Sequence, residues 1–146
     1  MDYYKRLLQR HHLRDTTPRR TIVAALLTAD HPLLIRELIA ACPHIDRTTI
    51  YRTLETLTDI GVVDIVPFGW KQRYELAAPF RAHHHHLQCE RCGAVIDIVS
   101  PELEQLISAL AEQHQFTVTE HVFELRGRCK TCYTYELAII GDTPSR

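Results

Sequence analysis

The sequence lacks the features that would place it outside the soluble globular proteins. No apolar run approaches the roughly 20 residues that a membrane span requires. Residues 1–10 lack the apolar core of a secretion signal. The chain has no internal repeat, and no low-complexity tract apart from its run of histidines. We therefore expect a cytoplasmic protein with no membrane partner.

The chain also lacks a strong charge of either sign. Its formal net charge of -1 argues against a protein that binds nucleic acid through its whole surface. The charge is nevertheless unevenly spread, because residues 1–20 contain six lysines and arginines but only two aspartates. A local basic patch can therefore serve nucleic-acid binding where the whole molecule would not.

Cysteine is present in an odd number, five. In a reducing cytoplasm thiols favour metal ligation over disulfides. The length fits one ordinary domain or two small ones, and small domains often need a metal or a partner chain to supplement a thin core. Cys42 lies in an apolar seam and is best interpreted as a packed core thiol.

The first half of the chain carries the apolar spacing of four helices. Thr16 followed by Pro18 predicts the start of the second helix, and Asp46 is a good N-cap for the fourth. Gly61 is expected to end the fourth helix. The predicted helices span residues 2–14, 17–29, 35–42 and 47–60.

Two short β-rich runs follow, 62–66 and 71–76, and predict a hairpin. Helices followed by a two-stranded wing indicate a winged helix-turn-helix, in which the helix after the turn enters the major groove of DNA. Polar residues on that helix and basic residues near the N-terminus are the candidate DNA contacts, the alternative being a solvated helix face. They are Arg19, Arg20, Thr49, Tyr51 and Arg52.

The signals change after a candidate hinge at residues 77–83. Runs 84–89, 94–99, 116–126 and 133–140 read as strands, and Ser100-Pro101 predicts the start of a helix. The fold class is therefore α/β (α+β), with a winged-helix DNA-binding domain at 1–76 and a small α/β dimerisation domain at 84–146. A sheet of few strands leaves open edges, so we expect a homodimer.

Two Cys-x-x-Cys pairs give the strongest chemical signal. Four thiolates on two tight turns can close a tetrahedron around one zinc ion and join distant parts of a small domain. Such a site has no open position and is structural rather than catalytic. Two disulfides or a redox dithiol are the alternatives. The residues are Cys89, Cys92, Cys129 and Cys132.

Four consecutive histidines, 83–86, precede the first of these pairs. In an extended run successive side chains point to opposite faces, so His83 and His85 would serve one site while His84 and His86 serve another. A solvated histidine-rich loop is the alternative. Further ligands must come from elsewhere, and spacing does not choose among the candidates His31, Glu75, Asp97, Glu104 and His121.

The sequence resembles the ferric uptake regulator family over about residues 3–135. Several motifs carry the resemblance together: Thr-Pro-Arg-Arg at 17–20, Thr-Thr-Ile-Tyr-Arg-Thr-Leu at 48–54, Arg-Tyr-Glu-Leu at 73–76, the histidine run with Cys-x-x-Cys-Gly at 83–93, and His121 with Gly-Arg-Cys-x-x-Cys at 127–132. The resemblance implies a dimeric repressor that binds a palindromic operator in double-stranded DNA when its regulatory metal is present.

The resemblance also assigns ligand sets. It implies a regulatory site at His31, Glu75, His84, His86 and Asp97, and a second site at His83, His85, Glu104 and His121. Tyr51 and Arg52 match recognition-helix positions, and Arg19 matches a contact to the DNA backbone. The chain departs from the family's pattern at the third histidine, often Asp, and at Asp97, often Glu.

These departures bear on the effector. A nitrogen-rich second site suits zinc at least as well as iron, so we expect a structural Zn²⁺ and a regulatory divalent metal, Zn²⁺ before Fe²⁺ or Mn²⁺. Asp97 also occurs in the peroxide-sensing branch of the family, which keeps a peroxide-sensing regulator as an alternative. Two other rivals are a zinc-dependent hydrolase and a DNA-binding protein that needs zinc only for structure. We expect no enzyme activity.

Overall fold

The structure is a computed structural model that describes residues 2–68 and 71–141. The chain divides into two compact units, residues 1–82 and 83–146, which are described separately. Within the described residues no helix has the length and apolar character needed to cross a bilayer.

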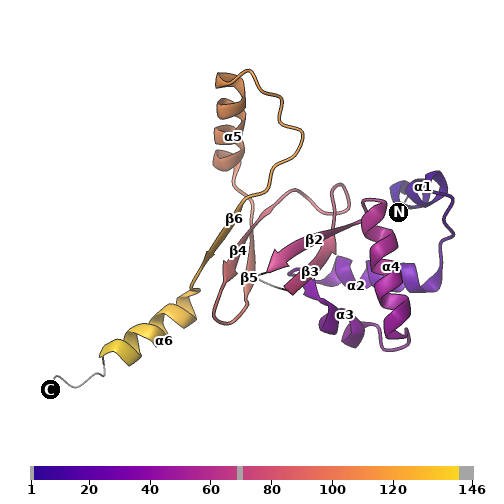
Figure 1. The fold of residues 1–146 in the computed structure, drawn as a ribbon, viewed down its shortest axis with the longest axis horizontal. Helices are drawn as coiled ribbons and strands as arrows, with labels where there is room; N and C mark the ends of the chain where they lie inside the picture. The colour runs from indigo at the N-terminus through magenta and orange to yellow at the C-terminus, as the bar shows by residue number, and fades with distance from the viewer. Residues whose placement is uncertain (1, 69–70, 142–146) are drawn as a thin grey trace. The chain divides into compact units, whose positions relative to one another are not determined.

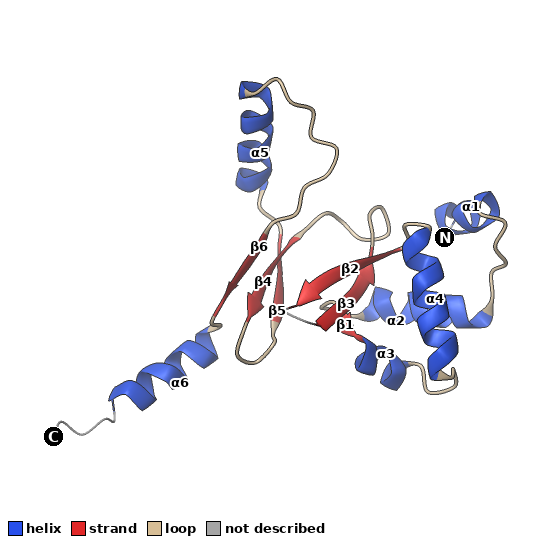
Figure 2. Ribbon diagram, in the orientation of Figure 1, coloured by secondary structure: helices blue, strands red, loops and turns tan. Residues whose placement is uncertain are grey.

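The first unit contains the four predicted helices, α1 (Asp2–Arg10), α2 (Thr17–Thr28), α3 (Ile35–Ala41) and α4 (Arg47–Asp59). Helix α1 ends earlier than expected, because His12 adopts a left-handed backbone conformation with φ 55°. The N–H of Leu13 then bonds the carbonyl of Leu8 at 2.8 Å and closes the helix. The prediction of four helices is confirmed (Figure 2).

Local capping explains where α4 begins and ends. The Asp46 carboxylate accepts a hydrogen bond from the N–H of Thr49 at 2.9 Å, as an N-cap should. At the other end Gly61 takes φ 70°, and the N–H of Val62 bonds the carbonyl of Leu57 at 2.8 Å. Both predicted ends of α4 are therefore confirmed. Thr16 precedes α2 as predicted, although its side chain makes no cap hydrogen bond.

The wing is an antiparallel hairpin of β2 (Val63–Phe68) and β3 (Lys71–Leu76), as predicted. A third strand, β1 (Leu33–Leu34), pairs with β3 on its other edge and gives the order β1-β3-β2. The sequence did not predict β1, because two residues are too few to show alternation. The arrangement of helices and wing is a winged helix-turn-helix (Figure 1).

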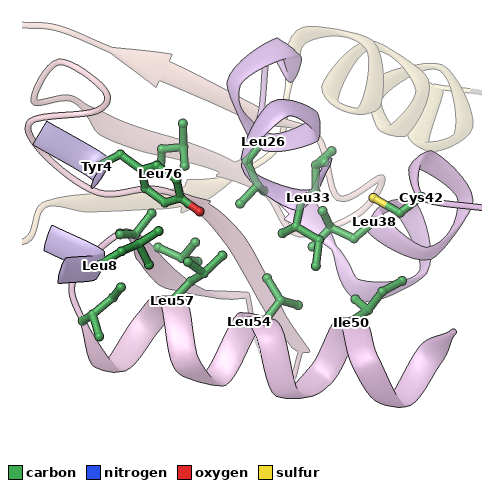
Figure 3. Close-up of a cluster of buried hydrophobic side chains, with 14 of the residues drawn as sticks. Tyr4, Leu8, Leu26, Leu33, Leu38, Cys42, Ile50, Leu54, Leu57 and Leu76 are labelled. Carbon is green, nitrogen blue, oxygen red and sulfur yellow. The ribbon is translucent and has the colours of Figure 1, made fainter. Parts of the chain in front are cut away.

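The core of the first unit lies between the helices and the wing. Ile50, Leu54 and Leu57 lie along one side of α4 and point toward Leu26 and Leu38 (Figure 3). All five side chains are at most 3% exposed. The apolar stripe predicted for the fourth helix is therefore its buried face.

Truncating this stripe tests the core directly. Leu57 is 0% exposed, so Leu57→Ala should lower the free energy of unfolding by about 2–5 kcal/mol through lost transfer energy and a cavity. Urea unfolding followed by circular dichroism measures the change. Leu27→Ala is the control, because Leu27 is 65% exposed and its truncation should cost far less.

The second unit is built on a three-stranded sheet in the order β5-β4-β6. Strands β4 (His85–Cys89) and β5 (Val95–Ile98) are antiparallel, whereas β6 (Glu124–Gly127) runs parallel to β4. Helix α5 (Pro101–Gln113) begins at Ser100, whose hydroxyl accepts a hydrogen bond from the N–H of Leu103 at 3.2 Å. The strands predicted at 84–89 and 94–99 and the helix start predicted at Ser100 are confirmed.

Two other strand predictions in this unit are wrong. Residues 133–140 belong to a helix, α6 (Lys130–Gly141), which begins directly after Cys129 with the N–H of Tyr133 on the Cys129 carbonyl at 2.9 Å. Its β-branched and aromatic residues fit a strand as readily as a buried helix. The run predicted as a strand at 116–126 is reduced to Glu124–Gly127, the residues that β4 pairs along this edge.

The second unit leaves much apolar surface exposed. None of the described residues of α5 is buried, and Leu106 and Leu110 on this helix are 56% and 48% exposed. In the segments on either side, Val99, Phe116 and Val122 are 68–80% exposed. Exposed apolar groups in this number are typical of a surface that a protein partner covers.

Candidate metal centres and DNA-binding residues

The four predicted thiolate ligands come together in the second unit. Cys89 ends β4, Cys129 precedes α6, and the sulfurs of Cys89, Cys92, Cys129 and Cys132 all lie within 4.8 Å of one another. All four thiols are free. With Zn–S bonds of about 2.3 Å, the sulfurs of a tetrahedral site lie about 3.8 Å apart. The Sγ atoms of Cys92 and Cys129 are 3.8 Å apart, so the cluster fits zinc.

The backbone around the cysteine cluster forms a tight turn and donates a hydrogen bond to one of the sulfurs. Gly93 has φ 78°, which a side chain would oppose, and its N–H bonds the Cys89 carbonyl at 2.9 Å to form the tight turn. The N–H of Cys129 donates to the Cys89 sulfur at 3.3 Å and is the main cause that lowers the pKa of Cys89 to about 6. Burial, by contrast, raises the pKa of Cys132 to about 12. The N–H of Cys129 thus favours the thiolate form of Cys89, which is the form that binds a metal.

The histidine run alternates between two faces, as its extended conformation predicts. The rings of His83 and His85 pack edge to face at 4.7 Å, and those of His84 and His86 do so at 4.9 Å. Each pair faces a different carboxylate, Glu104 for the first and Asp97 for the second. The prediction that one run supplies two separate pairs is confirmed.

His83 and His85 meet Glu104 from α5 and His121 from the following loop, with one ligand atom of each within 4.8 Å of the others. Nε2 of His85 lies 2.8 Å from Oε1 of Glu104, and Nε2 of His121 lies 3.4 Å from Oε2. The hydrogen bond with His85 is the largest influence that lowers the pKa of Glu104. Three imidazoles and one carboxylate form a donor set that fits zinc.

His84 and His86 lie beside Asp97 because β4 and β5 pair in this register. His86 is directly opposite Asp97 across the two strands, with Nε2 3.6 Å from Oδ1. Nε2 of His84 lies 4.0 Å from Oδ2 of the same carboxylate. The second unit thus brings together three of the residues assigned to the regulatory site by resemblance.

The other two residues assigned to the regulatory site, His31 and Glu75, belong to the first unit. Leu33 of β1 pairs with Tyr74 of β3 in an antiparallel register, which directs His31 and Glu75 to the same end of this strand pair. Nδ1 of His31 lies 2.6 Å from the Asp30 carboxylate, and this hydrogen bond is the main cause that lowers the pKa of Asp30. This contact uses Nδ1 and leaves Nε2 as the other ring nitrogen of His31.

Glu75 is 7% exposed, and its Oε2 accepts a hydrogen bond from a guanidinium nitrogen of Arg81 at 3.0 Å. Sequence reasoning missed both Asp30 and Arg81. Asp30 had a signal, since it adjoins a candidate ligand, whereas Arg81 had none beyond its place in the predicted hinge.

The candidate DNA contacts lie on α2 and α4. Tyr51 is 45% exposed and Arg52 is also exposed, on the face of α4 opposite the core. Thr49 adjoins them but bonds the Asp46 cap through both its N–H and its hydroxyl. Arg19 donates to the carbonyl of Arg14. Arg20 pairs with Asp15 at 3.2 Å.

Comparisons with known proteins match most of the chain. The model of the ferric uptake regulator family matches residues 10–126. The ferric uptake regulation protein of Bacillus subtilis (strain 168) is 34% identical over 142 residues, covering 90% of this chain and 93% of that protein. The peroxide-responsive repressor PerR of Staphylococcus saprophyticus is 32% identical and covers 80% of each chain.

A solved structure has the same fold. The crystal structure of the Vibrio cholerae ferric uptake regulator (Fur) is similar to this chain with a TM-score of 0.71 and 28% sequence identity. The similarity covers 86% of this chain and 99% of that one.

Proposed function

The chain belongs to the ferric uptake regulator family, and we propose that a metal bound by His31, Glu75, His84, His86 and Asp97 switches it into its DNA-binding form. The protein is a metal-responsive, DNA-binding regulator of transcription. The single observation that supports this switch is the alternation of the histidine run, which presents His84 and His86 to Asp97 away from the other two histidines.

The thiolate cluster has a different part in this proposal. Zinc held by four sulfurs cross-links the turn after β4 to the start of α6. Because all four positions of the ion are taken, this zinc supports the fold and leaves regulation to the histidine sites. His83, His85, Glu104 and His121 form the proposed second site, where the ion would tie α5 and the loop after it to the sheet.

The proposed mechanism converts metal occupancy into operator binding. Residues 1–76 bind DNA, 77–83 form the hinge, and 84–146 dimerise through the exposed apolar surface. In a dimer the angle between the two domains sets the separation of the paired α4 helices, which must match half-sites about one DNA turn apart. Metal that binds ligands from both domains selects the matching angle.

The DNA contacts proposed are Arg19, Arg20, Thr49, Tyr51 and Arg52. Arg52→Ala should weaken operator binding by about 5- to 150-fold if Arg52 contacts a base. Zinc content should stay unchanged, since Arg52 lies on α4 and not at a metal site. Fluorescence anisotropy with operator DNA measures the loss. Arg36→Ala is the control, because Arg36 is also exposed but lies on α3; equal losses in both variants would contradict a specific role for Arg52.

We propose Zn²⁺ as the regulatory ion, with Fe²⁺ or Mn²⁺ as alternatives. Histidine-rich sites bind zinc more tightly than iron or manganese in the usual order of divalent affinities. Operator binding titrated in parallel against buffered free zinc, iron and manganese identifies the effector. Activation by zinc at a lower free concentration than by the other two ions is the expected result.

A peroxide-responsive regulator is the second candidate, favoured by the similarity to PerR and by an aspartate at position 97. Treating the iron-loaded protein with hydrogen peroxide distinguishes this function from that of a zinc-responsive regulator. Loss of operator binding together with oxidation of a histidine in the run, found by mass spectrometry, would support it.

The proposal places the protein in the cytoplasm, without enzyme activity. A zinc hydrolase would need a metal with an open position beside a poised base. The histidine–carboxylate clusters instead offer enough donors to fill the coordination of an ion. Turnover of model esters or peptides by the zinc-loaded protein would contradict this assignment.

A further inference from the structure

Arg81 is an ion-pair partner of Glu75, one of the proposed ligands of the regulatory metal. Its guanidinium donates to Oε2 of Glu75 at 3.0 Å, and the Glu75 side chain is only 8% exposed. Leaving a buried carboxylate without a positive partner costs free energy, because the charge has lost its contact with water. Arg81 supplies a positive charge beside this carboxylate.

The chain holds Arg81 in place through the segment that precedes it. The N–H groups of Phe80 and Arg81 both bond the carbonyl of Ala77, at 2.9 and 3.3 Å. The Phe80 ring packs against Tyr3 and Tyr4 of α1, with centroids 5.4 and 6.4 Å away. Arg81 is therefore presented to Glu75 by a turn that packs on the core of the first unit.

A divalent ion bound by Glu75 would meet the positive charge of Arg81.

On the basis of the regulatory site proposed above, we propose that Arg81 is an internal competitor of the metal, held by Glu75 until the ion displaces it. The pair sets the threshold of the response, because part of the binding energy of the metal is used to break it. The residue acts through Glu75 and is a positioning residue, not a metal ligand.

The test compares Arg81→Gln, Arg81→Lys and Arg36→Ala in protein that carries zinc at the cysteine site. Arg81→Gln should reach half-maximal operator binding at about two- to five-fold lower free zinc, the range that a partly exposed ion pair can supply. Arg81→Lys keeps the charge and should remain near the original midpoint, as should Arg36→Ala. An unchanged or higher zinc requirement for Arg81→Gln would overturn the inference.

Two further readouts do not depend on DNA. Cobalt(II) titrated in place of zinc reports ligation through its d–d absorption, and its affinity should rise in Arg81→Gln by the same factor. Without regulatory metal, the effects of Glu75→Gln and Arg81→Gln on the unfolding midpoint should be non-additive, because each removes the same pair. Additive effects, or an unchanged cobalt affinity, would overturn the inference.

The outcomes separate this inference from the function it rests on. If Glu75→Ala abolishes the zinc response while Arg81→Gln leaves the midpoint unchanged, competition by Arg81 is excluded and the regulatory site stands. If Glu75→Ala leaves the zinc response intact, the regulatory site is wrong, and the inference is overturned with it.

Discussion

Cys92→Ser should release the zinc of the thiolate cluster and unfold the second unit. This unit has a short three-stranded sheet and a helix, α5, with no buried residue among those described, so it has little apolar core of its own. The cluster joins the turn after β4 to the start of α6. Losing one of four thiolates therefore removes the main link between distant segments.

The measurement is zinc content by atomic absorption together with the oligomeric state by sedimentation. The variant should contain less zinc and lose the dimer, whereas Cys42→Ala should keep both. Cys42 is the control because it is a free thiol outside the cluster and packs in the core of the first unit. A dimeric Cys92→Ser protein with its full zinc content would contradict the structural role of the cluster.

His84→Ala should abolish the metal dependence of operator binding. Coupling between an effector and a ligand is typically about 5- to 150-fold in affinity, and this whole factor should disappear. The reason is geometric, since His84 and His86 share Asp97 and removing one imidazole breaks up the group of ligands that the second unit supplies. The fold should survive, because the thiolate cluster does not include this residue.

Operator affinity of His84→Ala is measured with and without zinc, beside His114→Ala. His114 is exposed at the end of α5, so its variant should keep the full response. Full metal-dependent binding by His84→Ala would rule out the proposed switch. Weak binding by both variants at every zinc concentration would indicate a general loss of folded protein, which circular dichroism detects.

The sequence predicted the first unit well because its signals are local. The fourth helix has a capping aspartate, a glycine at its end and an apolar stripe of period 3.6, and each feature depends on residues near in sequence. Predictions failed where pairing partners decide the structure. Residues 116–126 needed a neighbouring strand, and β4 pairs only with Glu124–Gly127 along that edge. The apolar pattern of residues 133–140 is compatible with a strand and with a helix. These residues form part of α6, which begins directly after Cys129.

For the candidate sites as well, the sequence predicted the features set by local geometry and not those set by the tertiary fold. Alternation of the histidine run follows from strand geometry alone, so the two pairs were predictable from the residues. Which carboxylate faces which pair depends on the register of β4 and β5 and on the placement of α5, which spacing does not encode. Family resemblance supplied that choice. It did not supply Asp30 or Arg81, whose contacts with His31 and Glu75 depend on the folded first unit.

The central claim is that a metal at the histidine sites, and not the structural zinc, controls operator binding. It is tested most directly by operator binding of protein whose cysteine site stays filled, measured across a range of buffered free zinc. The account predicts affinity that rises by about 5- to 150-fold as the regulatory site fills. Binding curves that superimpose at all zinc concentrations would contradict it and would describe a DNA-binding protein that uses zinc only for its fold.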